Sequence, residues 1–491
     1  MRRIGWIFVL GALGACGDAT LDTGASTTTT SGEFTSSTGG GGSTSDCPPP
    51  PGPEALGTLM TGNPTDASLA LSVLPAAPLE LFVEFGGVDQ VDLSKTDVVK
   101  AQAGEPVTFA LGGLAKDAAQ RYRVRYRAPG CGELAATEDK AFHTQRKAGE
   151  AFTFTIQADS HRDEGSNLDL YRRALDNIRA DHGDFHVDLG DTFMTEKFAQ
   201  TKDEVVHRYV EERDYFGRIG DVVPLFLANG NHEGEAGWLD DGTADNMAVW
   251  TTNARLRYYV NPLPDGFYSG DGAEYPHVGK RGGYYAWEWG DALFVVLDPF
   301  WFTKAKAPKG NTDGWRWTLG DAQYHFLETT LQSSKARYKL VFSHHLIGGA
   351  DDARGGVEMA DWWEWGGKNP SGADEFAAKR PGWARPIHQL FLDTHVSAWF
   401  HGHDHLYCKQ DKDGIVYQEV PQPSHVGENG AATAAEWGYT QGTIRSSSGH
   451  LRLTVTSQKI TVEYVRAFLP QDEKGGHVNG EIGDSYTILP P

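Results

Sequence analysis

Partway along the chain, apolar and polar residues alternate and then change to a helical spacing. Phe152, Phe154 and Ile156 alternate with threonine and glutamine, the period of two that is typical of a β-strand. From Leu168 onward, apolar residues recur every three or four positions as far as residue 178. This spacing predicts an amphipathic helix that follows the strand.

The same patterns continue toward the C-terminus and predict further strands and helices. Strands are expected at 185–189, 222–228, 284–289, 292–297, 338–342, 396–400, 451–456 and 460–465, with a further helix at 321–332. Strands that alternate with helices indicate an α/β fold. In such folds the loops at the strand ends converge, so these ends are where a site is expected.

Residues 54–146 show a different pattern, with short strands and no helical spacing. The stretch 69–73, for example, alternates leucine and valine with small or polar residues. Several short strands with turn residues between them predict a small β-sandwich. Gly113-Leu114 and the Arg-Tyr-Arg-Val stretch at 121–124 resemble a fibronectin type III domain. Two roles are open for it: a spacer packed on its neighbour, or a module at the lip of a substrate site.

The N-terminus has the features of an export signal. Two arginines precede an apolar run over residues 4–13, which is shorter than the about 20 residues that a membrane-spanning helix needs. Leu13-Gly14-Ala15-Cys16 resembles the lipobox of bacterial lipoproteins. The resemblance implies removal of the signal peptide at 1–15, lipidation of Cys16, and a lipid anchor in the cell envelope, at the outer membrane or cell surface. An ordinary signal peptide with an incidental cysteine is the alternative.

Residues 16–53 are rich in serine, threonine and glycine and end in prolines at 48–51. Such a tract cannot bury a core, so it predicts a flexible tether. Three cysteines remain after Cys16, namely Cys47, Cys131 and Cys408. A Cys47–Cys131 disulfide would be compatible with an exported chain, although the sequence does not fix this pairing.

The composition indicates a packed globular protein with an acidic surface. Hydrophobic residues make up 39% of the chain, which is enough to build a core. Asp and Glu number 66 against 44 Lys and Arg, so the formal net charge is −22. A field of that sign repels polyanions, and bulk nucleic-acid binding is therefore not expected. A small, locally positive site remains compatible with this charge.

Carboxylate, amide and imidazole groups follow directly after five of the expected strands, a pattern that core packing does not require. The residues are Asp159, His161, Asp191, Asn231, His344, His403 and His405. A mixed set of oxygen and nitrogen donors suits Mn, Fe, Zn or similar ions. Seven donors are too many for one tetrahedral zinc, but they suit two ions if one carboxylate bridges.

The motifs around these donors resemble the signature of the calcineurin-like metallophosphoesterases. In order they are Asp-x-His at 159–161, Gly-Asp at 190–191, Gly-Asn-His-Glu at 230–233, a histidine at 344 and Gly-His-x-His at 402–405. The resemblance spans about residues 150–470. It implies a catalytic domain at 147–491 with an α/β (α+β) fold, in which two mixed β-sheets are sandwiched together and flanked by helices.

The resemblance also implies a role for each residue in the hydrolysis of a small phosphate ester. One ion would be held by Asp159, His161 and His405, the other by Asn231, His344 and His403, and both by Asp191. The two divalent or trivalent ions (Fe, Mn or Zn) would share a water, which would become the attacking hydroxide. His232 would act near the leaving group as acid or charge stabiliser.

Departures from related families narrow this expectation. Three residues after the bridging Asp, purple acid phosphatases carry a metal-bound Tyr and protein Ser/Thr phosphatases carry an Asp that orients the catalytic His. This chain has Met194 there, so no tyrosinate colour is expected and the partner of His232 is unknown. His182, His186 and His345 are expected to be structural or to face solvent. Arg162 and Arg354 are expected at the surface, with contact to a phosphate oxygen as the alternative.

Two other functional classes stay open. A surface binding lipoprotein with a degenerate phosphoesterase domain is one, although the ligand set is complete. A DNA-processing nuclease of the same superfamily is the other, and the charge of −22, the export signal and the lack of a basic stripe oppose it. The sequence does not discriminate between phosphate monoesters and diesters.

Overall fold

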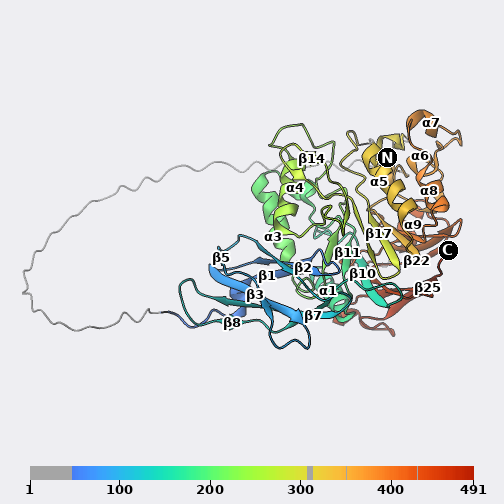
Figure 1. Cartoon of the computed structure of the whole chain (residues 1–491). Coiled ribbons are helices and arrows are strands. Elements are labelled where there is room, and N and C mark those ends of the chain that lie inside the picture. Colours follow the sequence, from blue (N-terminus) through green and yellow to red (C-terminus); the bar gives the residue numbers. More distant parts are fainter. Residues whose placement is uncertain (1–46, 307–312, 350, 428–429) are drawn as a thin grey trace, which may run out of the picture. The chain divides into compact units, whose positions relative to one another are not determined.

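The computed structural model describes residues 47–306, 313–349, 351–427 and 430–491 (Figure 1). By its contacts the chain divides into residues 1–46 and residues 47–491, and the description below concerns the second unit. The expected signal peptide, Cys16 and most of the expected tether lie outside the described residues. Within the described ranges, no helix is both long enough and apolar enough to cross a membrane.

Two large β-sheets dominate the part of the chain that the structure describes. The first has the order β25-β24-β23-β10-β11-β12-β1-β2-β6, and the second has the order β13-β16-β17-β18-β19-β21-β20-β22. The strands of the first sheet that lie after residue 147 are β10 (Phe152–Gln157), β11 (His186–Asp188), β12 (Leu225–Leu227), β23 (Gly449–Val455), β24 (Ile460–Arg466) and β25 (Ile482–Ile488). The second sheet contains β13 (Ser269–Gly270), β16 (Tyr285–Trp289), β17 (Ala292–Val296), β18 (Tyr338–Phe342), β19 (Ala398–His401), β20 (Tyr407–Lys412), β21 (Ile415–Glu419) and β22 (Thr443–Arg445).

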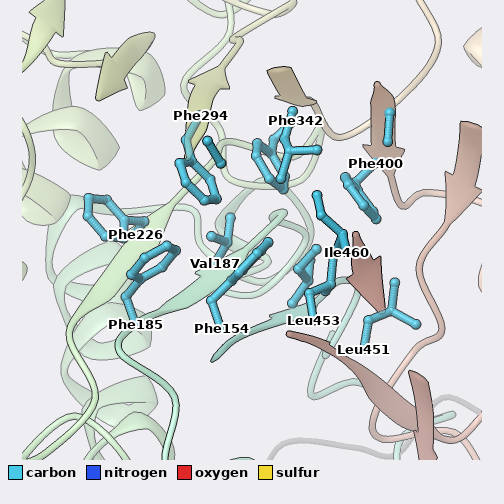
Figure 2. Packing of buried hydrophobic residues seen from close by; sticks show 14 of the residues in the cluster. Phe154, Phe185, Val187, Phe226, Phe294, Phe342, Phe400, Leu451, Leu453 and Ile460 are labelled. Carbon is cyan, nitrogen blue, oxygen red and sulfur yellow. The ribbon is translucent and has the colours of Figure 1, made fainter. Parts of the chain in front are cut away.

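The two sheets share a buried apolar core, which Figure 2 shows from close by. Phe154 of β10 meets Phe294 of β17 edge to face, with 5.1 Å between ring centroids. Phe342 of β18 stacks on Phe400 of β19 at 5.4 Å. Each fully buried side chain of this kind contributes about 1.5–3 kcal/mol relative to exposure. The expected fold class, two mixed sheets sandwiched together and flanked by helices, is therefore confirmed.

Helices cover the outer faces of both sheets. The two expected helices are present, α1 at Leu168–Ala180 and α5 at Gly320–Ser333. The sequence patterns missed the others, which are α2 (Thr195–Phe198), α3 (Lys202–Phe216), α4 (Met247–Tyr258), α6 (Trp363–Gly366), α7 (Phe376–Lys379), α8 (Ile387–Asp393) and α9 (Gly430–Glu436). Apolar residues of α1, α3 and α4 pack with β12, and those of α5 and α8 pack with β17 and β18.

The N-terminal strands continue the first sheet and also form a second layer. They are β1 (Thr58–Gly62), β2 (Ser68–Leu74), β3 (Leu79–Gly87), β4 (Ser94–Lys95), β5 (Val99–Ala101), β6 (Val107–Gly112), β7 (Ala119–Arg127), β8 (Ala135–Ala136) and β9 (Lys140–His143). Gly62 of β1 pairs in parallel with Leu225 of β12. Tyr122 donates a hydrogen bond to the Asp221 carbonyl at 2.6 Å. Cys47 and Cys131 form a disulfide.

The strand directions bring several chain segments to one edge of the first sheet. β10, β11 and β12 are parallel, so their carboxyl ends lie at the same edge. β23 pairs antiparallel with β10 and β24 antiparallel with β23, and Gly449 lies opposite Arg466. The start of β23 and the end of β24 therefore reach the edge where β10 ends. This edge carries Asp159, His161, Asp191 and Asn231, whereas the other three candidate ligands follow β18 and β19 of the second sheet.

Candidate metal centre

The loops after the strands hold their polar residues in an uncommon backbone conformation. The φ angles are 59° at Asp159, 56° at His161, 55° at Asp191, 80° at His403 and 61° at His405. Non-glycine residues adopt positive φ rarely and at a cost of the order of 1–3 kcal/mol. Such strain persists where surrounding contacts hold it and often marks functional sites.

One group of candidate ligands consists of Asp159, His161 and His405. Oδ1 of Asp159 lies 3.7 Å from Nε2 of His161 and 3.5 Å from Nε2 of His405. Asp159 is held by its second oxygen, which accepts a hydrogen bond from the backbone N–H of His403 at 2.8 Å. We call these three residues the first ligand group.

A second group consists of Asp191, His344 and His403. Nε2 of His344 lies 3.2 Å from Oδ2 of Asp191 and 3.2 Å from Nδ1 of His403. The amide oxygen of Asn231 joins them, at 3.1 Å from Nε2 of His344. These four residues are the second ligand group.

Asp191 lies between the two groups. Its Oδ2 is 3.2 Å from His344 and 3.7 Å from Nε2 of His161 in the first group. Its Oδ1 accepts a hydrogen bond from the backbone N–H of His232 at 2.8 Å. This is the position that a bridging carboxylate needs, so all seven residues from the sequence patterns come together at one site.

The donor set fits metal ions. Oδ1 of Asp159 and Nε2 of His161 are buried without a hydrogen-bond partner, although unsatisfied buried polar atoms are costly. Bonds of about 2.0–2.2 Å to a shared ion place ligand atoms roughly 3–4 Å apart, which is the spacing observed. Without an ion, the surrounding carboxylates overcome the effect of burial and raise the pKa of His161 well above its usual range.

Glu233 fixes the loop that carries Asp191. Its buried carboxylate accepts hydrogen bonds from the backbone N–H groups of Asp191, Thr192 and Phe193, at 2.8, 2.7 and 3.1 Å. Burial and the charge of Asp191 raise the pKa of Glu233 to about 7. The sequence motif contained Glu233, but no role had been expected for it.

The partner of His232 is Glu196. Oε2 of Glu196 lies 2.7 Å from Nδ1 of His232, so Nδ1–H donates and Nε2 faces away from the carboxylate. Glu196 lies on the short helix α2, two residues after Met194. Met194 occupies the position at which related phosphatases carry the residue that orients the histidine. A search for any carboxylate shortly after the Gly-Asp motif would have found Glu196.

For Arg162 and Arg354 the sequence favoured a surface position over contact with a phosphate oxygen, but Arg162 is buried and both have carboxylate partners. Arg354 donates to the carbonyl of His403 and, at 3.1 Å, to Oδ1 of Asp404. Arg162 is buried and pairs with Glu211 at 2.7 Å and also with Glu212. Their charges are matched within the protein, as a structural role requires.

The histidines outside the motifs do not join the ligand groups. His182 is exposed. His186 is buried, with Nδ1 at 2.8 Å from the Thr155 hydroxyl, and burial lowers its pKa to about 3. His345 is buried between the rings of Phe300 and Trp317, each at 4.8 Å.

Proteins of known structure share this architecture. PhoD matches with a TM-score of 0.61 and 15% sequence identity, over 88% of this chain and 90% of PhoD. A purple acid phosphatase from yellow lupin seeds matches with a TM-score of 0.56 and 14% identity, over 88% of this chain and 74% of that enzyme. The chain has the metallophosphoesterase fold. No protein-family model and no curated protein matches the sequence. The identity to PhoD and to the lupin enzyme is low, so the function is inferred from the geometry of the site.

Proposed function

We propose that this protein is a metal-dependent hydrolase of phosphate esters that uses two ions of Fe, Mn or Zn. The observation that carries the proposal is the pair of ligand groups with Asp191 between them. Mixed oxygen and imidazole donors at this spacing suit these ions. A small phosphate ester is the expected substrate, because the two ions would offset the negative charge of the protein at the metal centre.

Each ligand group would bind one of the two ions. Asp159, His161 and His405 would hold one ion, Asn231, His344 and His403 the other, and Asp191 both. When bound, two such ions supply Lewis acidity, which activates water as a nucleophile and stabilises charge on the phosphoryl oxygens. The side chains themselves fix the ion positions, because the hydrogen bonds to the loops hold each ligand in place.

We propose that His232 transfers a proton to the leaving oxygen. Its Nδ1–H donates to Glu196, which fixes the ring orientation and leaves Nε2 to carry the proton. A protonated Nε2 can donate to the leaving oxygen as the ester bond breaks. Glu196 acts through His232 and is therefore a positioning residue.

The test of this proposal is metal reconstitution of the stripped protein with Mn, Fe or Zn. We expect hydrolysis of 4-nitrophenyl phosphate or of its bis ester to return with at least one of these metals. Asn231→Ala should abolish turnover and lower the metal content, while His182→Ala, at an exposed histidine, should match the wild type. A metal-replete wild type without activity would contradict the proposal and favour a binding protein.

We further propose that the protein is exported and held in the cell envelope by a lipid on Cys16. The Cys47–Cys131 disulfide supports export, because such bonds form in oxidising compartments. Fractionation of cells that express the wild type or Cys16→Ser tests the anchor. We expect the variant to leave the membrane fraction, and an unchanged distribution would contradict the anchor.

A further inference from the structure

A pocket near the first ligand group has no role in the chemistry proposed above. Its volume is about 280 Å³, and its walls include His425, Val426, Arg466, Phe468 and His477. We call it the Phe468 pocket. Sites that enclose a drug-sized ligand measure about 300–1,000 Å³, so this pocket lies at the small end of that range and has room for a group such as a single ring.

The pocket lies at the edge of the first sheet that also carries Asp159 and His161. Ser447 and Ser448, which line it, directly precede β23, and Ala467 to Leu469 directly follow β24. Both segments reach the edge where β10 ends, because β23 runs antiparallel to β10 and β24 antiparallel to β23. The loop with Asp159 follows β10, so the pocket is beside the first ligand group.

Hydrogen bonds tie the pocket wall to the ligand loops. The Ser447 hydroxyl donates to the carbonyl of His405 at 3.1 Å. The Ser424 hydroxyl, next to His425, donates to the carbonyl of Ser160 at 2.7 Å. The side chain of His405 is 33% exposed, whereas that of His161 is 6% exposed. The open side of the first group is therefore at His405, the residue whose backbone carbonyl contacts the pocket wall.

The walls are suited to a flat, uncharged ring. The ring of Phe468 stacks on His477, with 5.0 Å between centroids, and lies 4.5 Å from the Arg466 guanidinium. A buried apolar cluster of Leu170, Ala174, Ala467 and Leu469 lies behind it. Aromatic and planar groups recognise a further ring by stacking.

The cations of the pocket have carboxylate partners. Arg466 lies 3.7 Å from Glu481, and Lys474 lies 3.8 Å from Asp472. His477 also contacts Glu481, at 2.9 Å. These pairs hold the side chains that frame the Phe468 pocket, and Nε of Arg466 is a further buried donor without a hydrogen-bond partner.

The order of strands shows which side of the substrate the ring occupies. Along the edge the order is β24-β23-β10-β11-β12. The pocket lies by β23 and β24, whereas His232 follows β12. If His232 serves the leaving oxygen, the ring in the pocket belongs to the other arm of the ester.

We infer that the Phe468 pocket binds the non-leaving arm of a phosphodiester, an arm that carries one planar ring. The inference rests on the proposed function, since it assigns a substrate class to the same metal centre. It implies a preference for diesters with a ring-bearing arm over diesters with a small aliphatic arm.

Two diesters with the same leaving group test this assignment. Phenyl 4-nitrophenyl phosphate and methyl 4-nitrophenyl phosphate both release 4-nitrophenolate, and only the first has a ring on the retained arm. We expect Phe468→Ala to lower kcat/KM for the phenyl diester about tenfold, the order of one lost aromatic contact. The value for the methyl diester should stay within about twofold.

A second variant covers the case in which Phe468→Ala disturbs folding. Val426 is 54% exposed at the pocket wall, so Val426→Trp should block the pocket without affecting the core. It should reproduce the selective loss with the phenyl diester. Phe267→Ala is the matched control, because Phe267 is also a half-buried phenylalanine but lies on the other sheet, near β13.

Two outcomes would overturn the inference about the pocket, and a third would overturn the proposed function. Equal losses for both diesters in Phe468→Ala and Val426→Trp would show that the pocket holds the leaving ring, which overturns the inference. Unchanged values for both diesters in both variants would show that no ring binds there, and this also overturns it. If the metal-loaded wild type hydrolyses neither diester nor 4-nitrophenyl phosphate, the proposed function itself fails.

Discussion

The two ligand groups differ in their access to solvent. In the second group, the side chains of His344 and Asp191 are 0% and 2% exposed. In the first group, the side chain of His405 is 33% exposed. The second group is thus enclosed by the protein, whereas the first has an open side.

Outer contacts hold imidazoles in both groups, and in the first group Nδ1 of His161 lies 3.2 Å from a carboxylate oxygen of Asp163. Nδ1 of His344 donates to the carbonyl of Leu189 at 3.0 Å, and Nε2 of His403 donates to the carbonyl of Asp352 at 2.9 Å. Each ring therefore presents its other nitrogen to the site, and such outer contacts increase metal affinity. The difference between the groups is therefore the exposure of His405, which indicates a tightly held second ion and a more exchangeable first ion on the open side.

The largest effect is expected at Asp191, the residue that the two groups share. Asp191→Asn weakens both groups at once, so kcat should fall by at least about a thousandfold, beyond the about 10²–10³ that a single electrostatic contact contributes. Steady-state kinetics and metal analysis check this. A variant with normal turnover would break the comparison, because Asp191 would not link the groups.

A smaller and unequal effect is expected from removing one imidazole in each group. His344→Ala removes a buried ligand, and we expect activity that added metal does not restore. His405→Ala removes the exposed ligand, and raising the metal concentration should restore part of the activity by mass action. Equal behaviour of the two variants in a metal titration would contradict the difference between the groups.

Glu196→Gln should have a moderate effect that depends on the leaving group. If Glu196 positions His232, kcat should fall about 10- to 100-fold with a poor leaving group such as phenolate and less with 4-nitrophenolate. Metal content should not change. Glu328→Gln is the control, because Glu328 also lies near a histidine, His325 at 3.7 Å, but on α5. A loss independent of the leaving group would argue against proton transfer by His232.

The smallest effect concerns colour. Met194 stands where purple acid phosphatases carry a tyrosine ligand, and in the structure it is fully buried. An iron-loaded sample should therefore lack the visible absorption band of a tyrosinate–iron complex. A purple sample would show that a tyrosine reaches one of the two groups.

The sequence predicted the strands that precede the candidate ligands, and it nominated the seven residues that lie together in the structure. Each ligand follows an apolar strand, and strands with a period of two are local patterns that a sequence displays directly. Asp159 follows β10 of the first sheet and His405 follows β19 of the second, so the association of these two residues came from the family resemblance of the motifs. The roles of the individual residues were expected from the resemblance of the ordered motifs to a known family.

Residues outside such patterns could not be found in this way. Glu196 lies on a four-residue helix, α2, too short to show helical periodicity. Phe468 lies in the turn after β24 and becomes a pocket wall only through its contacts with Arg466 and His477. The pairing of β1 with β12 depends on contacts between distant segments, so the alternation in residues 54–146 could not reveal it.

The most direct test of a centre with two unequal ion sites is a chelation and reconstitution series with metal analysis and activity measured together. The account predicts two ions per chain in the active protein. It also predicts that chelation removes one ion rapidly, with loss of activity, and the other slowly. In His405→Ala, only the slow release should remain. Full activity with one ion or none, or simultaneous release of both ions, would contradict it.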